Sequence, residues 1–258
     1  MSYLYETHLH TSVASACGRS VGSEYIQRYL DAGYSGIIVT DHFFNGNSSI
    51  PSNLPWKERV NRLCAGYEET KEVGDQLGLS VFFGFEYSYG VDEYLIYGVD
   101  KEWLIDHPEI MRLDHQSLFE TVDSLDGLMI QAHPFRERSY LWEINLHPYS
   151  VHGVEVTNGE NDPECNRKAY AYAKAHNLSM TSGADIHSAL KVGSTTQPMR
   201  FDYPLDSIAD FIAAVKANKG YATTIVDQIA PRNTTTVPVH YYDESNRVRK
   251  IQIKEAWA

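Results

Sequence analysis

The chain has 258 residues, a hydrophobic fraction of 43% and a formal net charge of −12, from 22 basic and 34 acidic side chains. This apolar content is enough for a substantial core, and we predict one α/β domain over residues 1–258. A negative surface repels a phosphate backbone, so extended contact with nucleic acid is disfavoured.

The sequence also argues against membrane and disulfide-rich classes. The N-terminus has no basic segment followed by an apolar run, so no signal peptide is predicted. No apolar run approaches the roughly 20 residues needed to cross a bilayer. The three cysteines are an odd number without a C-x-x-C spacing, which disfavours a disulfide framework. We expect a cytoplasmic protein with no membrane partner, and the sequence makes no prediction of oligomeric state.

Strand-like and helix-like segments alternate along most of the chain. Short apolar runs rich in β-branched residues predict buried strands at 35–40, 79–83, 127–131, 153–157 and 178–181. Helical patterns cover 23–32, with Ser23 as the cap, 56–77, and 163–176, with Pro163 in the first turn. From residue 221 onward the chain becomes β-rich. Residues 234–242 and 247–253 predict a hairpin that decorates the same domain.

This alternation predicts a parallel sheet, either open or closed into a barrel. A barrel is preferred because polar residues follow many different strands, and the loops after barrel strands build active sites. An open doubly wound sheet usually carries a glycine-rich phosphate loop, and the sequence has neither G-x-G-x-x-G nor a Walker motif.

Histidines and carboxylates recur where predicted strands end. In a strand, residues i and i+2 face the same side, so His8 and His10 can hold one ion, and Asp185 and His187 repeat that spacing. Glu86 offers two oxygens for a bridge, and Asp41 is predicted to orient an imidazole. The predicted ligands of a multinuclear Zn, Mn or Fe site are His8, His10, His42, Glu86, His133, Asp185 and His187. We predict structural roles for His107, His115, His147, His152, His176 and His240, which lack partners at ligand spacing.

Six short motifs, taken together, resemble one known family. They are His8-Leu-His-Thr11, Thr40-Asp-His42, Gly84-Phe-Glu86, Ala132-His-Pro-Phe-Arg136, Glu155-Val-Thr-Asn158 and Ser182-Gly-Ala-Asp-Ile-His187. In this order they resemble the PHP (polymerase and histidinol phosphatase) domain over roughly residues 3 to 200. The resemblance implies a distorted seven-stranded βα (TIM-like) barrel with up to three metals at its C-terminal mouth. It also implies that His8, His10, Glu86 and Asp185 hold the first metal, Glu86 and His133 the second, and His42 and His187 the third.

Two positions depart from the family pattern. The family usually has an Asp or His seven or eight residues after the first His, where this chain has Ser15 and Ala16. It also usually has a His on the strand after the Glu, where this chain has Leu95. Water, substrate phosphate, Asp92, Glu93 or Cys17 are candidates to complete the second and third sites. For Cys17, packing as a small buried thiol is the more common role.

The leading functional hypothesis is hydrolysis of a small phosphomonoester, such as histidinol phosphate or a nucleotide, by water that two or three divalent ions activate. Asp185 and His187 are the candidate proton relays. Arg19, Arg136 and Asn158 are the candidate substrate-binding residues, since a guanidinium matches two phosphate oxygens.

Three alternatives remain open at this stage. One is a nuclease or phosphodiesterase that acts on short nucleic-acid ends, although no basic stripe with interleaved aromatic residues is present. Another is an amidohydrolase, against which we find no Lys placed to bridge two metals. The last is a degenerate barrel that binds metal or ligand without turnover, which the two missing ligands favour.

Overall fold

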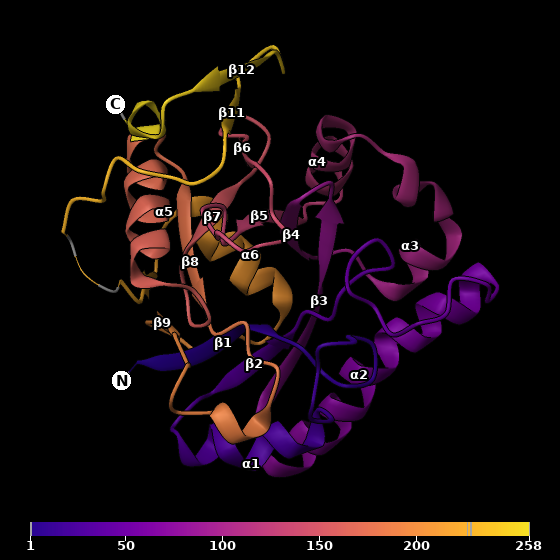
Figure 1. Ribbon diagram of the computed structural model, residues 1–258. Helices are drawn as coiled ribbons and strands as arrows, with labels where there is room; N and C mark the ends of the chain where they lie inside the picture. Colours follow the sequence, from indigo (N-terminus) through magenta and orange to yellow (C-terminus); the bar gives the residue numbers. More distant parts are fainter. Residues whose placement is uncertain (1, 226, 228, 258) are drawn as a thin grey trace.

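The computed structural model describes residues 2–225, 227 and 229–257. Its main feature is a nine-stranded mixed sheet (Figure 1). In spatial order the strands are β10 (Tyr221–Thr223), β9 (Met199–Phe201), β1 (Tyr3–Leu9), β2 (Gly36–Val39), β3 (Ser80–Tyr89), β4 (Asp92–Tyr97), β5 (Leu128–Ala132), β7 (Gly153–Asn158) and β8 (Ser179–Gly183).

The seven strands from β1 to β8 in this order curve into a ring that closes just beyond the end of β8. Leu9 and Ile186 form a parallel bridge. In it His10 N donates to Ile186 O at 2.9 Å and Ile186 N donates to His8 O at 3.2 Å. The predicted distorted seven-stranded barrel is confirmed. The sheet is not wholly parallel, however, because β4 is antiparallel to both β3 and β5. A tight turn joins β3 to β4, and so short a connection permits only antiparallel pairing.

One end of the barrel is closed by apolar packing. Helix α6 (Ile208–Ala217) lies in the middle of the ring of strands in Figure 1. Its residue Phe211 is buried in one cluster with Tyr5, Tyr97 and Phe201. The polar residues described below therefore gather at the opposite end, the mouth.

The remaining helices cover the outside of the barrel. They are α1 (Ser23–Asp31), α2 (Trp56–Leu77), α3 (Lys101–Asp106), α4 (His115–Ser124) and α5 (Pro163–Ala175), with short 3-10 turns at Pro108–Arg112, Ala189–Lys191 and Ile253–Trp257. The predicted segments at α1, α2 and α5 are confirmed to within one residue. The Ser23 cap was wrong, because Gly22 precedes the helix and Ser23 is its first residue. Helices α3, α4 and α6 were not predicted.

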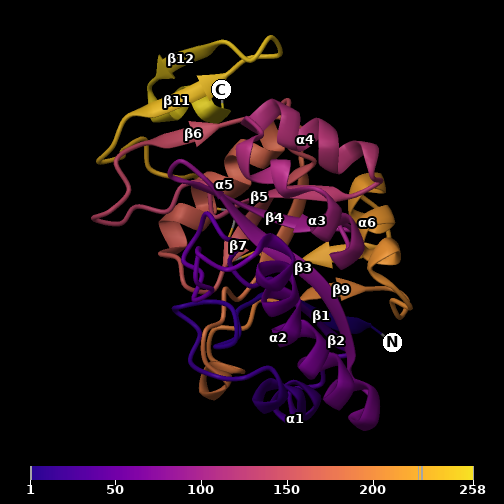
Figure 2. The same cartoon turned by 90° about the vertical axis from the view of Figure 1, so that its right-hand side faces the viewer.

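The predicted C-terminal hairpin is confirmed as the shorter strands β11 (Val239–Tyr242) and β12 (Val248–Ile251). A third strand, β6 (Ile144–Leu146), pairs parallel to β11. Figure 2 shows this three-stranded sheet stacked beside the barrel. The extension predicted from residue 221 is divided, because β10 joins the barrel sheet instead. No described helix has the length and apolar character needed to cross a membrane.

Candidate metal centre

A bulge in β1 directs its two histidines into the barrel. Glu6 pairs with Ile37 whereas Leu9 pairs with Val39, so β1 holds one more residue than β2 over this stretch. The Glu6 carboxylate accepts bonds from Thr7 N and His8 N, both at 3.0 Å, and from Ala184 N at 2.7 Å. Burial nevertheless raises the pKa of Glu6 to about 7. Tyr5 faces the interior before the bulge, and after it His8 and His10 do.

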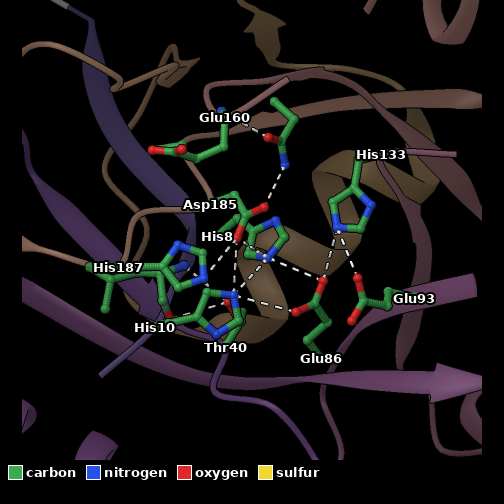
Figure 3. A network of polar contacts seen from close by, with 12 residues as sticks. His8, His10, Thr40, Glu86, Glu93, His133, Glu160, Asp185 and His187 are labelled. Carbon is green, nitrogen blue, oxygen red and sulfur yellow. Dashed lines mark hydrogen bonds and ion pairs between the residues drawn. The ribbon is translucent and has the colours of Figure 1, made fainter. Parts of the chain in front are cut away.

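Four side chains from three strand ends converge at the mouth, as Figure 3 shows. His8 Nε2 lies 3.4 Å from Glu86 and 3.5 Å from Asp185, and His10 Nε2 lies 3.4 Å and 3.2 Å from the same two carboxylates. The two imidazole nitrogens are 3.1 Å apart. Ligands held at zinc distances of about 2.0–2.1 Å at the corners of a tetrahedron are separated by about 3.4 Å. The spacing of His8, His10 and Asp185 therefore fits a single divalent ion, with the Glu86 carboxylate beside it.

The two carboxylate oxygens of Glu86 face two different groups of ligand atoms. Its Oε1 lies 3.1 Å from His133 Nε2, and its Oε2 lies 3.0 Å from His42 Nδ1. The second contact lacks hydrogen-bond geometry, so this buried His42 nitrogen has no hydrogen-bond partner among the described residues. A buried ring nitrogen aimed at a carboxylate without a hydrogen bond is satisfied when a cation lies between them. The geometry suits Glu86 as a bridge.

Charge pairing dominates the titration of this cluster in the metal-free chain. Burial opposes ionisation of Glu86 and Asp185, yet the neighbouring His8 holds the pKa of both carboxyls well below its ordinary value. Burial also opposes protonation of His8 and His42, but the surrounding carboxylates raise the pKa of both rings well above the ordinary value. The pKa of His10 is lowered to about 3 by burial and by His42. The cluster is thus a set of buried charges that compensate one another.

A residue that the ligand prediction missed orients His8. Glu155 is fully buried and accepts from His8 Nδ1 at 2.9 Å, which turns Nε2 toward the cluster. The same carboxylate accepts from His133 N at 3.2 Å and Asn158 Nδ2 at 2.9 Å. A bulge in β7 directly after Glu155 shifts the register against β8. The sequence signal was present in the motif Glu155-Val-Thr-Asn158, but its role depends on contacts across the barrel.

Asp41 interacts with the imidazoles indirectly, through hydrogen-bonded neighbours. It accepts from Thr11 N at 2.7 Å and from the hydroxyls of Thr11 and Ser15, both at 2.6 Å. The Ser15 hydroxyl in turn lies 3.1 Å from His10 Nδ1 and accepts from His42 N at 2.9 Å. Asp41 therefore positions two site histidines through Ser15.

The backbone is strained at two of the predicted ligands. His133 has φ 31° and Asp185 has φ 53°, both in the left-handed region. Such conformations persist where the surrounding structure enforces them, and they concentrate at functional sites. Pro134 follows the first of these residues and fixes the turn there.

A pocket of about 440 Å³ opens above the cluster. Arg136, Asp92, Glu93 and the aromatic side chains Tyr140 and Trp142 are among the residues that line it. Arg136 is held in place, since it donates to Asn158 at 2.9 Å, Asn161 at 2.8 Å and Asp185 at 2.5 Å. Arg19 is exposed and is not among the lining residues. Its phosphate-binding role stays a prediction.

Comparisons with known proteins agree with this fold. A family model described as PHP-associated matches residues 163–219. A probable histidinol-phosphatase from Deinococcus radiodurans is 34% identical over 92 residues, which are 33% of this chain and 32% of that protein. The chain thus spans about a third of the length of this curated relative. These two matches, each over part of the chain, confirm its resemblance to the PHP family.

Solved structures share the PHP fold at low sequence identity. A two-domain protein from Bacteroides vulgatus, described as containing a predicted PHP-like metal-dependent phosphoesterase, has a TM-score of 0.63 and 17% identity. The match covers 86% of this chain and 64% of that one. A lesion-specific endonuclease from Pyrococcus furiosus has a TM-score of 0.54 and 12% identity, covering 86% of this chain and 58% of that one.

One departure from the PHP pattern lies on β4, and a carboxylate lies close to the substituted position. Leu95 lies directly opposite Glu86 and is buried in the barrel interior. Glu93 lies two residues before Leu95 in β4, on the same face of the strand and nearer the mouth. Its carboxylate approaches His133 to 3.5 Å and His42 to 3.8 Å. Asp92, the other candidate on this strand, instead accepts from Asn145 at 3.1 Å.

Proposed function

We propose that this chain is a metal-dependent phosphoesterase that hydrolyses small phosphomonoesters. The observation that carries the proposal is the convergence of His8, His10, Glu86 and Asp185, with spacings of 3.1 to 3.5 Å between ligand atoms. His133 and Glu93 extend this cluster to a second group of ligands around Glu86. The likeness to a histidinol-phosphatase supports a phosphomonoester as substrate.

The protein's own charges require cations for such a substrate. Without metal, the carboxylates of Glu86, Glu93 and Asp185 are balanced by protonated His8 and His42 and by Arg136, so the pocket has no excess positive charge to attract a phosphoryl group. Divalent ions held there invert the local field, lower the pKa of a water molecule toward neutrality and neutralise the phosphoryl oxygens. Arg136 contributes by fixing the Asp185 carboxylate and by keeping a permanent positive charge on the pocket wall.

The same geometry refines the predicted proton relay. Asp185 is held ionised beside Arg136 and His8, which suits a ligand better than a proton donor. His187 also directs its ring toward the cluster, with Nε2 at 3.7 Å from Asp185. We therefore assign both residues to the metal ions, and the leaving oxygen takes its proton from water in the open pocket.

Hydrolysis assays on protein loaded with Mn, Zn or Fe test the proposal. p-Nitrophenyl phosphate and histidinol phosphate represent monoesters, and bis(p-nitrophenyl) phosphate represents diesters. We expect turnover of the monoesters, and its loss in His133→Ala and Asp185→Ala. His240→Ala, which removes an imidazole at the hairpin, serves as the matched control with unchanged turnover.

Three results would contradict parts of this proposal. Undiminished hydrolysis in both His133→Ala and Asp185→Ala overturns the site assignment. Turnover of the diester alone favours a phosphodiesterase instead. No rate above buffer on any phosphoester with any of the three metals indicates a barrel that binds without catalysis.

A further inference from the structure

A second departure from the family pattern lies in the loop after β1, around Ser15, Ala16 and Cys17. The Ser15 hydroxyl is fully occupied by Asp41, His10 and the backbone of His42, so it is not free to bind an ion. Ala16 is exposed and carries no ligand atom. Neither position at the family's usual spacing supplies a ligand.

The loop nevertheless directs another donor into the pocket. Ser15 and Gly18 are joined by a backbone bond from Gly18 N to Ser15 O at 3.1 Å, which closes a tight turn. Gly18 permits this turn, because a Cβ there would lie only 2.2 Å from Thr11 O. Cys17 sits inside the turn and lines the pocket.

Three ligand atoms meet at this point. The Cys17 sulfur lies in one group with ring nitrogens of His42 and His187, all within 4.8 Å of one another. His10 belongs to the same group, but its Nε2 is directed at Glu86 and Asp185 and its Nδ1 at Ser15. The three remaining donors form an NNS set that opens onto the pocket.

The other two cysteines have a different setting. Cys64 on α2 and Cys165 on α5 are buried in one apolar cluster, where they pack as small hydrophobic side chains. Cys17 is absent from the described apolar clusters and is partly exposed. Cys17 is therefore not the buried thiol that was expected.

We propose that Cys17 replaces the usual carboxylate or imidazole as a thiolate ligand of the third metal ion, together with His42 and His187. The proposal rests on the metal centre of the proposed function. Three protein ligands and one open position are typical of a catalytic zinc site. Thiolate sulfur favours Zn²⁺ over Mn²⁺ or Mg²⁺, so this position selects a thiophilic ion while the Glu86 and Asp185 positions accept harder ones.

Cobalt substitution reads out the sulfur ligand directly. Protein stripped of metal and reloaded with Co²⁺ should show thiolate-to-cobalt charge-transfer absorption in the near ultraviolet. We expect Cys17→Ser to lose this band and to bind one fewer zinc ion per chain, while Cys165→Ala keeps both. A band of equal strength in Cys17→Ser overturns the proposal.

Alkylation of the wild-type chain provides a test that does not depend on the variant folding. Iodoacetamide should label Cys17 in the metal-free protein, and zinc should protect it while manganese does not. Equal labelling with and without zinc overturns the proposal.

The thiolate ligand and the proposed hydrolytic function can fail independently. Phosphoester hydrolysis without a sulfur band rejects the thiolate site alone, and a sulfur band without hydrolysis rejects the proposed function alone.

Discussion

Two clusters of buried histidines in this chain have opposite electrostatic settings. At the barrel mouth, carboxylates surround the rings and raise the pKa of His8 and His42 well above the ordinary value. In the second cluster, His115 and His147 stack with ring centroids 3.8 Å apart, and Tyr242 stacks on His147 at 4.0 Å. Burial lowers the pKa of these two rings to about 4 and about 2.

The difference shows that burial alone does not make a histidine a metal ligand. No carboxylate of the described chain lies within ion-pair distance of His115 or His147, so their rings stay neutral and act as flat packing surfaces between α4, β6 and β11. At the mouth, by contrast, the carboxylates of Glu86, Asp185 and Glu155 lie next to the His8 ring and stabilise its protonated form. The structural role predicted for His115 and His147 agrees with this packing.

The largest expected effect is the removal of the carboxylate that bridges the mouth cluster. Glu86→Gln keeps the shape but deletes the charge shared by the two groups of ligands. A metal-assisted reaction depends on several kcal/mol of charge stabilisation, so we expect phosphoester turnover to fall about a thousandfold or more. Elemental analysis should show fewer ions per chain. His115→Phe in the second cluster is the control, and an equal loss there would remove the distinction between the clusters.

Metal binding at the mouth should depend steeply on pH. His8 and His42 are protonated in the metal-free chain at pH 6 to 7, because their pKa is raised, and a ligand imidazole must be neutral. Binding therefore releases protons, and affinity rises with pH, by about tenfold per proton released for each pH unit. Calorimetric titrations in buffers of different ionisation enthalpy measure this release. A zero proton count at pH 6.5 would contradict the charge assignment.

Orienting contacts should matter less than the ligands themselves. Glu155→Gln removes the charge that fixes His8 through Nδ1, and we expect metal affinity to fall about 10- to 100-fold with the fold retained. Competition with a coloured chelator measures the affinity, and circular dichroism checks the fold. Glu160→Gln, at an exposed ion pair with Lys191, is the matched control and should leave affinity unchanged.

The smallest effect is expected from acid at the second cluster. A histidine whose pKa is lowered in the folded chain takes up its proton only on unfolding, so stability falls as pH drops below the unfolded pKa of about 6.5. At pH 5.5 this amounts to about 1.4 kcal/mol for each ring. His147→Phe keeps the stack, and denaturant unfolding should show a shallower loss between pH 7 and 5.5. An unchanged slope would show that His147 is not held neutral.

Local sequence patterns were sufficient to predict the barrel and most of the residues that gather at the candidate site. Pairs such as His8 and His10, two apart in a strand, share a face regardless of distant contacts, and apolar runs that end in Asp or His predict strand ends at a mouth. The PHP resemblance supplied the order of these motifs. Local signals predicted where α2 ends, at Gly78, and where α5 begins, at Asp162-Pro163.

Which groups face one another depends on the three-dimensional fold. The bulge in β1, the antiparallel course of β4 and the pairing of β6 with β11 depend on contacts between residues far apart in the chain. The first two place His8 beside Glu155 and Glu93 beside His133, and the bridge between β1 and the segment after β8 brings the Cys17 loop to His187. Sequence spacing alone does not predict these side-chain contacts, because a shift of one residue in strand register reverses the face that a side chain occupies. The convergence of the four residues predicted for the first ion therefore followed from the sequence, whereas the contacts of Glu155, Glu93 and Cys17 followed from barrel closure.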